Sequence, residues 1–243
     1  MTQIRWMAIK IILPGRVSIL LTDAPAAVYD SVVITFAEIS AHINSEWVTI
    51  KGDTTSIDLL QWTNGKYMVL AEDDIPVGKY TQIRIKIIEA HISVDGQVYE
   101  LGVPSAAKTG LKLVHQFTIS SGSGYELAID FDANRSVVRM GSSKNPKGYK
   151  LKPTLRIIAT SIAGSISGNV TKPQDIPLAC AVSGADTLTS TYVDSIDGAF
   201  MLAFLPQGSY TVSVEDTTGK TFNKTDVMVT AGVDNVLGVI TLE

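Results

Sequence analysis

The sequence predicts an all-β protein of two sandwich domains in tandem, of the immunoglobulin-like or transthyretin-like type. Short apolar segments with the two-residue period of a strand recur along the whole chain, and turn residues separate them. Of the 243 residues, 45% are apolar and 18% charged, which suits two separately buried cores. The heptad Ile-Pro-Val-Gly-Lys-Tyr-Thr at 75–81 also returns in similar form at 205–211.

The first part of the chain carries strand segments joined by specific turn signals. Asn64-Gly65 and Asp95-Gly96 tolerate positive φ at both central positions and predict type I′ turns. Asp132 predicts the N-cap of a short helical turn over residues 132–137. The predicted strands cover residues 16–21, 31–43, 56–61, 67–71, 80–93, 97–101, 111–119, 125–131 and 149–160.

Small residues dominate the stretch 159–168 and predict the junction between the domains. Seven short strands follow it within about 80 residues, a spacing typical of immunoglobulin-like sandwiches. They cover residues 165–170, 178–183, 189–193, 199–203, 209–215, 220–230 and 236–242. The predicted division is an N-terminal strand extension over 1–14, a first sandwich over 15–162 and a second sandwich over 163–243.

The repeated heptad predicts one local device used twice. Its proline fixes φ at a turn, and its glycine takes a conformation that other residues avoid. Tyr80 and Tyr210 then open the next strand, and we expect each hydroxyl to bond back to the backbone of the turn, as in a tyrosine corner.

Several blocks in the first part resemble a prokaryotic family known as domain of unknown function 4382. The opening Val-Ser-Ile-Leu-Leu-Thr-Asp-Ala-Pro at 17–25 looks like the hallmark of that family. The resemblance covers roughly residues 15–162, and the blocks occur in the right order. The others are 31–39, Trp47, 57–60, 78–84, 129–132 and 151–153.

The second part resembles the carboxypeptidase regulatory-like or prealbumin-like modules. The resemblance is carried by Gly-Ser-Ile-Ser-Gly at 164–168, Asp-Ser-Ile-Asp-Gly-Ala-Phe at 194–200 and Leu-Pro-Gln-Gly-Ser-Tyr at 205–210. Such modules are generally non-catalytic sandwiches attached to secreted or surface proteins. The resemblance therefore implies an exported protein, often a lipoprotein, although this chain has no lipobox cysteine.

Charge and cysteine content narrow the class of protein further. The net charge is -4 and the basic residues are scattered, so no basic stripe marks a nucleic-acid partner. The apolar run 6–13 is interrupted by Lys10, is too short to span a bilayer and lacks a cleavage site. We expect an extracellular or cell-surface protein whose export signal is not visible. A removed signal, an unusual start and a protein that stays inside remain the alternatives. We expect the single Cys180 to be a buried, inert thiol.

The residue types that catalysis needs do not form a recognisable constellation. His42, His91 and His115 lie in separate strand segments, and no G-x-S-x-G motif accompanies them. Glu72-Asp73-Asp74 has the pattern of a solvated loop. We therefore expect a protein that is not an enzyme and binds no cofactor.

Asp23, Asp130 and Asp132 are the candidates for a metal site. Asp130 and Asp132 fall on one side of an extended segment, and Asp23 from the Thr-Asp-Ala-Pro turn could complete an oxygen-rich cation site. The structural alternative is that Asp23 and Asp132 cap turns through backbone N–H groups. In that case Asp130 pairs with a base such as Arg84.

Two further sets of residues are compatible with an exposed surface. Trp6, Trp47 and Trp62 could form an aromatic platform for a glycan, although core or rim positions are the structural alternative. Asn-x-Ser/Thr sequons make glycosylation candidates of the three residues Asn134, Asn169 and Asn223.

The segment before the family hallmark is too apolar to hang in water. As a strand, it would place Ile4, Trp6 and Ala8 on one side, and Met7, Ile9, Ile11 and Leu13 on the other. It could add to its own sheet, or pair with a neighbouring subunit and give a fibre. The candidate subunit contacts are Ile4, Trp6, Ala8, Ile9 and Ile11.

The sequence thus predicts a structural or adhesion protein that acts through protein–protein contacts. Its sharper form is a filament subunit that self-associates into a homopolymer through its N-terminal strand. A carbohydrate-binding surface module is the alternative.

Overall fold

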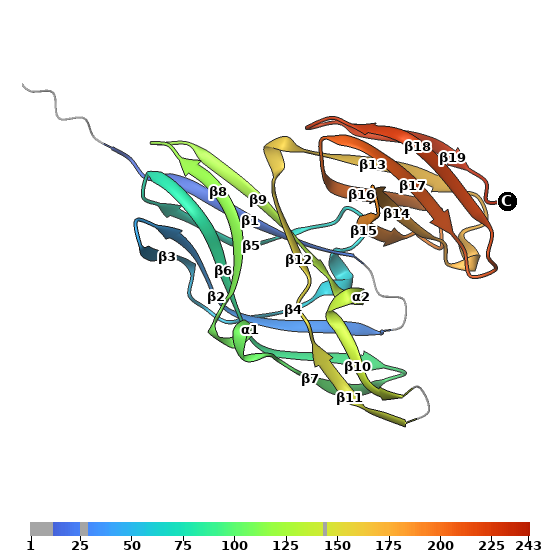
Figure 1. Ribbon diagram of the computed structural model, residues 1–243, viewed down its shortest axis with the longest axis horizontal. Coiled ribbons are helices and arrows are strands. Elements are labelled where there is room, and N and C mark those ends of the chain that lie inside the picture. Colours follow the sequence, from blue (N-terminus) through green and yellow to red (C-terminus); the bar gives the residue numbers. More distant parts are fainter. Residues whose placement is uncertain (1–11, 25–28, 143–144) are drawn as a thin grey trace, which may run out of the picture.

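A computed structural model describes residues 12–24, 29–142 and 145–243, and in them the chain forms four β-sheets (Figure 1). The sheets pair into two sandwiches. One core gathers buried side chains between Val17 and Ala159, and another gathers those between Ile166 and Ile240. The prediction of an all-β, sandwich-like fold is confirmed. None of the helices in these residues has the length and apolar content that a membrane span requires.

The N-terminal sandwich packs a four-stranded sheet on an eight-stranded sheet. The smaller sheet has the order β12-β9-β1-β5, in which β1 runs parallel to β9 and antiparallel to β5. Its strands are β1 (Gly15–Ala24), β5 (Met68–Ile75), β9 (Gly124–Asp132) and β12 (Leu155–Ala159).

The larger sheet has the order β10-β11-β7-β6-β2-β3, with β4 beside β2 and β8 beside β6. Its strands are β2 (Ser31–Ile43), β3 (Glu46–Lys51), β4 (Thr55–Asp58), β6 (Gly78–Val94), β7 (Gln97–Gly102), β8 (Leu111–Ile119), β10 (Val137–Ser142) and β11 (Asn145–Leu151).

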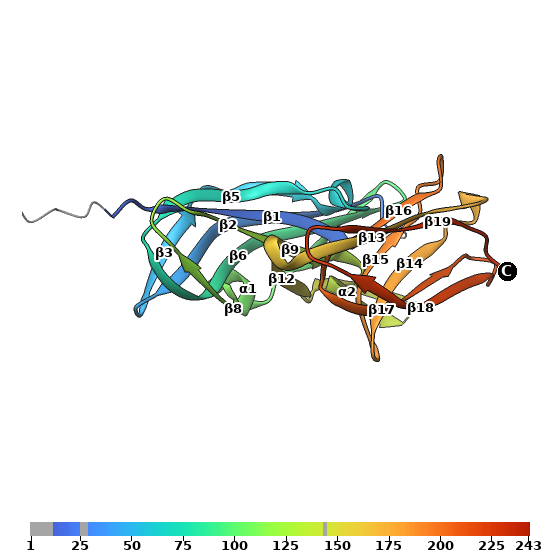
Figure 2. The same ribbon diagram turned by 90° about the horizontal axis from the view of Figure 1, so that it is seen from above.

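The C-terminal sandwich packs a three-stranded sheet on a four-stranded sheet. The three-stranded sheet has the order β16-β13-β19, and the four-stranded sheet has the order β15-β14-β17-β18. The strands are β13 (Ala163–Val170), β14 (Leu178–Ser183), β15 (Asp186–Tyr192), β16 (Ala199–Pro206), β17 (Gly208–Glu215), β18 (Thr221–Val229) and β19 (Asp234–Ile240). Both views show the two sandwiches end to end along the long axis, with the C-terminus at one end and the start of β1 toward the other (Figures 1 and 2).

A helical turn and a proline explain two of the differences between the predicted and the observed strands. The 3-10 helix Leu59–Trp62 follows β4 because the Asp58 carboxylate accepts a hydrogen bond from the Leu60 backbone N–H at 3.3 Å, so the predicted strand 56–61 is wrong beyond Asp58. The predicted strand 149–160 is broken between β11 and β12, where Pro153 cannot donate to a ladder. The other helical turns are α1 (Ser105–Thr109), α2 (Ala133–Ser136) and the 3-10 helices Thr160–Ile162 and Pro173–Asp175.

The predicted turns and cap occur where the residues indicate them. Asp95 and Gly96 have φ of 51° and 74° and join β6 to β7, as a type I′ hairpin requires. Asn64 and Gly65 have φ of 56° and 79°, but their turn follows a 3-10 helix and does not join two paired strands. Asp132 caps α2 by accepting a hydrogen bond from the Arg135 backbone N–H at 2.8 Å.

The repeated heptad forms the same corner in both sandwiches. The Tyr80 hydroxyl donates to the carbonyl oxygen of Pro76 at 2.8 Å, and the Tyr210 hydroxyl donates to that of Pro206 at 2.7 Å. Gly78 and Gly208 sit at φ of 150° and 157°, where a side chain would be strained. Each corner takes the chain from one sheet to the facing sheet, from β5 to β6 and from β16 to β17. The heptad is therefore one place in each sandwich where the chain crosses from one sheet to the other.

Replacing Tyr80 with phenylalanine should lower the free energy of unfolding by about 1 kcal/mol, because the buried hydroxyl loses its hydrogen bond to the Pro76 carbonyl. Tyr210→Phe should cost about the same amount in the C-terminal sandwich. Chemical denaturation measures both effects. Tyr99→Phe is the control, since the Tyr99 side chain is 40% exposed on β7. Equal stability of all three variants would contradict the corner's structural role.

Candidate functional site

The two sandwiches meet at a small apolar cluster that belongs to neither main core. Leu20 of β1, Ala128 of β9 and Ile158 of β12 come from the N-terminal sandwich. Ala163 and the half-buried Phe204 come from β13 and β16 of the C-terminal sandwich. Burial of this cluster makes the junction a packed contact between the sandwiches.

Phe204 reaches the junction because β16 is irregular at that point. The pairing of β16 with β13 shifts register between Gly164 and Ile166, and Phe204 has a φ of 52°. A bulky residue is strained at positive φ, and a bulge turns its side chain away from the regular alternation. The Phe204 ring packs edge-on against Tyr67 of the N-terminal sandwich, with the ring centroids 5.8 Å apart. The local strain is therefore tied to the contact between the sandwiches.

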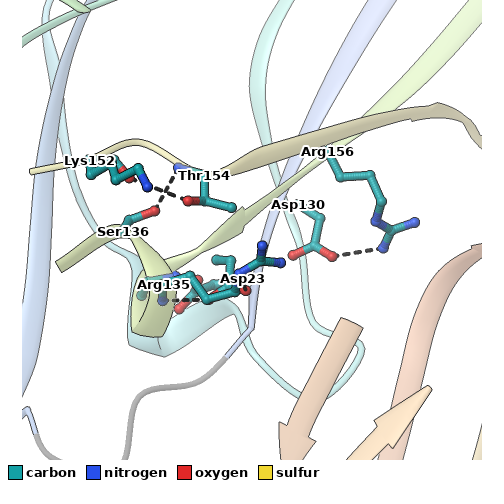
Figure 3. A network of polar contacts seen from close by, with 9 residues as sticks. Asp23, Asp130, Arg135, Ser136, Lys152, Thr154 and Arg156 are labelled. Carbon is teal, nitrogen blue, oxygen red and sulfur yellow. Dashed lines mark hydrogen bonds and ion pairs between the residues drawn. The ribbon is translucent and has the colours of Figure 1, made fainter. Parts of the chain in front are cut away.

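A buried ion pair lies beside this cluster. The Arg156 Nη2 atom is 2.7 Å from the Asp130 Oδ2 atom, and the two side chains point toward one another (Figure 3). Asp130 is only 5% exposed, so its charge needs a partner. The Arg156 Nη1 atom also donates a hydrogen bond to the backbone carbonyl of Phe204. One guanidinium thus joins β9, β12 and β16.

Asn64 makes a second polar connection across the junction. Its Nδ2 atom donates to the Ala199 carbonyl oxygen at 3.2 Å, and its Oδ1 atom accepts from the Met201 backbone N–H at 2.6 Å. A strand added at this edge would form hydrogen bonds with the same backbone N–H and carbonyl groups of β16. The amide therefore occupies part of the outer edge of β16. The Asn-Gly dipeptide indicated a turn, but it gave no signal of this contact.

A groove of about 610 Å³ opens beside the junction, between the ends of β9 and β12 and the hairpin of β14 and β15. Both charge signs line it, with Asp132 and Arg135 joining the Asp130–Arg156 pair. Burial raises the pKa of Asp132, and the hydrogen bond from the Arg135 backbone N–H partly offsets that rise. Asp130 and Arg156 connect strands at the junction, and Asp132 caps the turn α2 beside them.

The three aspartates of the candidate metal site are engaged with the protein itself. The Asp23 Oδ1 atom accepts from the Ala133 backbone N–H at 2.8 Å, and Asp132 caps α2. Asp130 pairs with a base, as the structural alternative expects, but that base is Arg156 and not Arg84. Arg84 instead bonds Glu38 at 3.0 Å. In the described part of the chain, no group of three or more His, Cys, Asp or Glu side chains gathers around one point.

The acidic run 72–74 lies on the edge strand β5 and is not a loop, which corrects the prediction. Glu72 accepts hydrogen bonds from the Arg16 guanidinium at 2.8 Å and from the Ser18 hydroxyl at 2.6 Å. The bond from Arg16, followed by that from Ser18, lowers the pKa of Glu72 to about 2. These charges line an edge that would otherwise be open to another strand.

The histidines and tryptophans are dispersed over the N-terminal sandwich. A ring nitrogen of His42 forms a hydrogen bond with the Thr81 hydroxyl at 2.9 Å, and His115 lies 3.4 Å from the Tyr125 hydroxyl. His91 of β6 lies opposite Glu100 of β7 in the sheet. Arg84 covers one face of Trp47, with its Cζ atom 4.3 Å from the ring centroid. Trp62 packs against the first core, and Trp6 lies outside the described residues. Trp47 and Trp62 therefore present no shared platform.

The remaining predicted residues fall in separate places. Asn134 and Asn223 are exposed, whereas the Asn169 amide donates to the Asp197 carbonyl oxygen at 2.7 Å. Cys180 is half-buried on β14, less enclosed than expected, and burial raises the pKa of its thiol. The candidate subunit contacts Ile4, Trp6, Ala8, Ile9 and Ile11 lie outside the described residues.

The chain belongs to a family of domains that is defined by sequence. That family is the one described as domain of unknown function (DUF4382), whose model matches residues 14–153. The predicted resemblance of the first part is confirmed, and the carboxypeptidase regulatory-like character of the second part stays a prediction. No curated protein matches the chain.

Two solved structures from Bacillus species superpose weakly on the chain. The Bacillus anthracis TIE protein aligns with 9% identity and a TM-score of 0.27, over 95% of this chain and 51% of that one. The chain thus spans about half of that protein. The major pilin subunit BcpA of Bacillus cereus aligns with 10% identity and a TM-score of 0.22, over 95% of this chain and 70% of that one. Likeness at these TM-scores does not bear on function.

Arg156→Met should lower the free energy of unfolding by about 3–5 kcal/mol, because it leaves the buried Asp130 carboxylate without its partner. The double variant Arg156→Met/Asp130→Asn should recover much of that loss, since the uncompensated charge is gone. Chemical denaturation measures both. Arg135→Met is the control, because the Arg135 side chain is 63% exposed and should cost little. A double variant as unstable as the single one would contradict this role.

Proposed function

We propose that this protein is a non-catalytic structural or adhesion protein that works outside the cell or at its surface. It acts through protein–protein contacts and self-associates into a homopolymer. The N-terminal segment, residues 2–13, joins each subunit to the next by strand addition. The observation that carries the proposal is that Ile12 and Leu13, the described residues of this segment, lie at the end of the N-terminal sandwich opposite the C-terminal sandwich.

The place of entry follows from described contacts. The Leu13 backbone N–H donates to the Ser121 hydroxyl at 3.0 Å, and Gly122 N–H donates to the Pro14 carbonyl at 3.1 Å. Both partners lie in the loop between β8 and β9, beside the first residues of β1. Ile12 and Leu13 are both exposed there. Toward its other end, β1 contributes Leu20 to the junction.

A packed junction supports such a role because a subunit that bears load between its two ends needs a fixed relation between them. Phe204, Arg156 and Asn64 each connect the two sandwiches. Subunits joined head to tail form a heterologous interface, which gives a fibre when the rotation from one subunit to the next does not close a ring.

Deleting residues 2–13 should abolish filaments, because the strand that links neighbouring subunits is gone. Electron microscopy of the purified full chain and of the deletion variant, at equal concentration, checks this. Filaments that persist unchanged after the deletion would contradict the proposal that strand addition joins the subunits.

Thermal unfolding of the same deletion variant distinguishes the two places where the segment could pair. If the segment binds a neighbouring subunit, the monomeric variant should unfold at the temperature of the monomeric full chain. A strand that completed its own sheet would instead leave an exposed apolar edge when deleted, and would lower that temperature by several degrees.

A further inference from the structure

The edges of the sheets differ in how they are protected against strand addition. Charged residues mark most of them, for example the acidic run on β5 and Lys224 with Asp226 on β18. The outer edge of β16 is partly occupied by the Asn64 amide. β19 is the last strand of its sheet and contains neither Lys, Arg nor Pro. Its one charged residue, Asp234, accepts hydrogen bonds from the Ser165 and Ser167 hydroxyls of β13, so the rest of this edge strand carries no charged side chain.

Exposed apolar side chains accompany this edge. Val236 and Val239 of β19 are 68% and 74% exposed. Two positions three apart would normally face opposite sides of a strand, but the register of β19 against β13 shifts between them and Gly238 adopts a φ of 79°. Both valines therefore line one groove of about 440 Å³ on the outer face of the sheet, together with Phe200 and Met201.

The formal charges of two parts of the chain indicate which segment binds at this edge. Residues 163–243 contain nine acidic and three basic residues, a formal charge of -6. Residues 1–13 contain Arg5 and Lys10 and no acidic residue, a formal charge of +2. An apolar segment with this charge complements an apolar edge on an acidic domain.

Chain length decides which copy supplies the segment. Eight residues of extended chain from Ile12 to Leu20 at the junction cover roughly 26 Å. The eleven residues before Ile12 span at most about 36–40 Å. A chain's own segment would use about 26 Å to return to the junction, which leaves only about 10–14 Å of its length. Pairing with the seven residues of β19 needs about 23 Å. The segment of one chain is thus too short to line its own β19.

We propose that the free edge of β19, with the exposed side chains of Val236 and Val239, binds residues 2–13 of a second copy of this chain. This inference rests on the proposed function and names its acceptor surface. The added strand would extend the sheet β16-β13-β19, and its apolar side chains would cover the two valines. When each subunit binds the next one in this way, the repeated contact gives the fibre.

Two full-length variants test the acceptor surface. Val236→Lys/Val239→Lys places charge on the acceptor edge, and Ile4→Asp/Ile9→Asp places charge on the donor segment. Each variant alone should be monomeric by light scattering. Mixed at equal concentration, they should form a dimer of twice the monomer mass and nothing larger, because the first still donates and the second still accepts.

Val114→Lys is the matched control, because Val114 is 76% exposed on β8 of the N-terminal sandwich. This variant should assemble as the unmodified chain does. If Val236→Lys/Val239→Lys forms filaments like the unmodified chain, or if the two monomeric variants fail to pair, the β19 assignment is overturned while strand addition at another edge stands. If the unmodified chain stays monomeric at every concentration, the proposed function fails as well.

Discussion

The buried carboxylate of Asp130 is the constraint around which the junction is built. A charge that is 5% exposed is stable only with a partner, and Arg156 on the adjacent strand β12 supplies it. The same guanidinium then reaches the Phe204 carbonyl, so the pair also connects the second sandwich to the first. Phe204 accepts that bond in a left-handed conformation at the bulge of β16. Pairing, bulge and ring contact therefore depend on one another.

Each sandwich depends in turn on its corner. The Pro-x-Gly-x-Tyr sequence carries the chain from one sheet to the facing sheet, and the tyrosine hydroxyl closes the turn at both places. Burial of alternate apolar side chains between the sheets contributes to the free energy of folding of each sandwich. Such an architecture always leaves sheet edges, and their treatment differs along the molecule. Charges line the edge at β5, Asn64 binds the edge of β16, and β19 displays valines.

This distribution gives the proposed assembly a direction. Leu13 binds at the far end of the N-terminal sandwich, and the edge strand β19 with its exposed valines lies on the C-terminal sandwich. The formal charges differ in sign as well, since residues 1–13 carry +2 and residues 163–243 carry -6. A packed junction between them keeps donor and acceptor apart within one subunit. The proposed fibre thus follows from the layout of a single chain.

The sequence by itself determined the all-β class, the repeated corner, the cap at Asp132 and most strand positions, because these depend on neighbouring residues and on a two-residue period. It did not identify Arg156 as the partner of Asp130, since the two are 26 residues apart and meet only through the pairing of β9 with β12. Nor did it reveal the role of Asn64, whose partners lie in the other sandwich. Only the tertiary structure decided which strands are edges and which valines face outward, because sheet order and bulges arise from contacts distant in sequence.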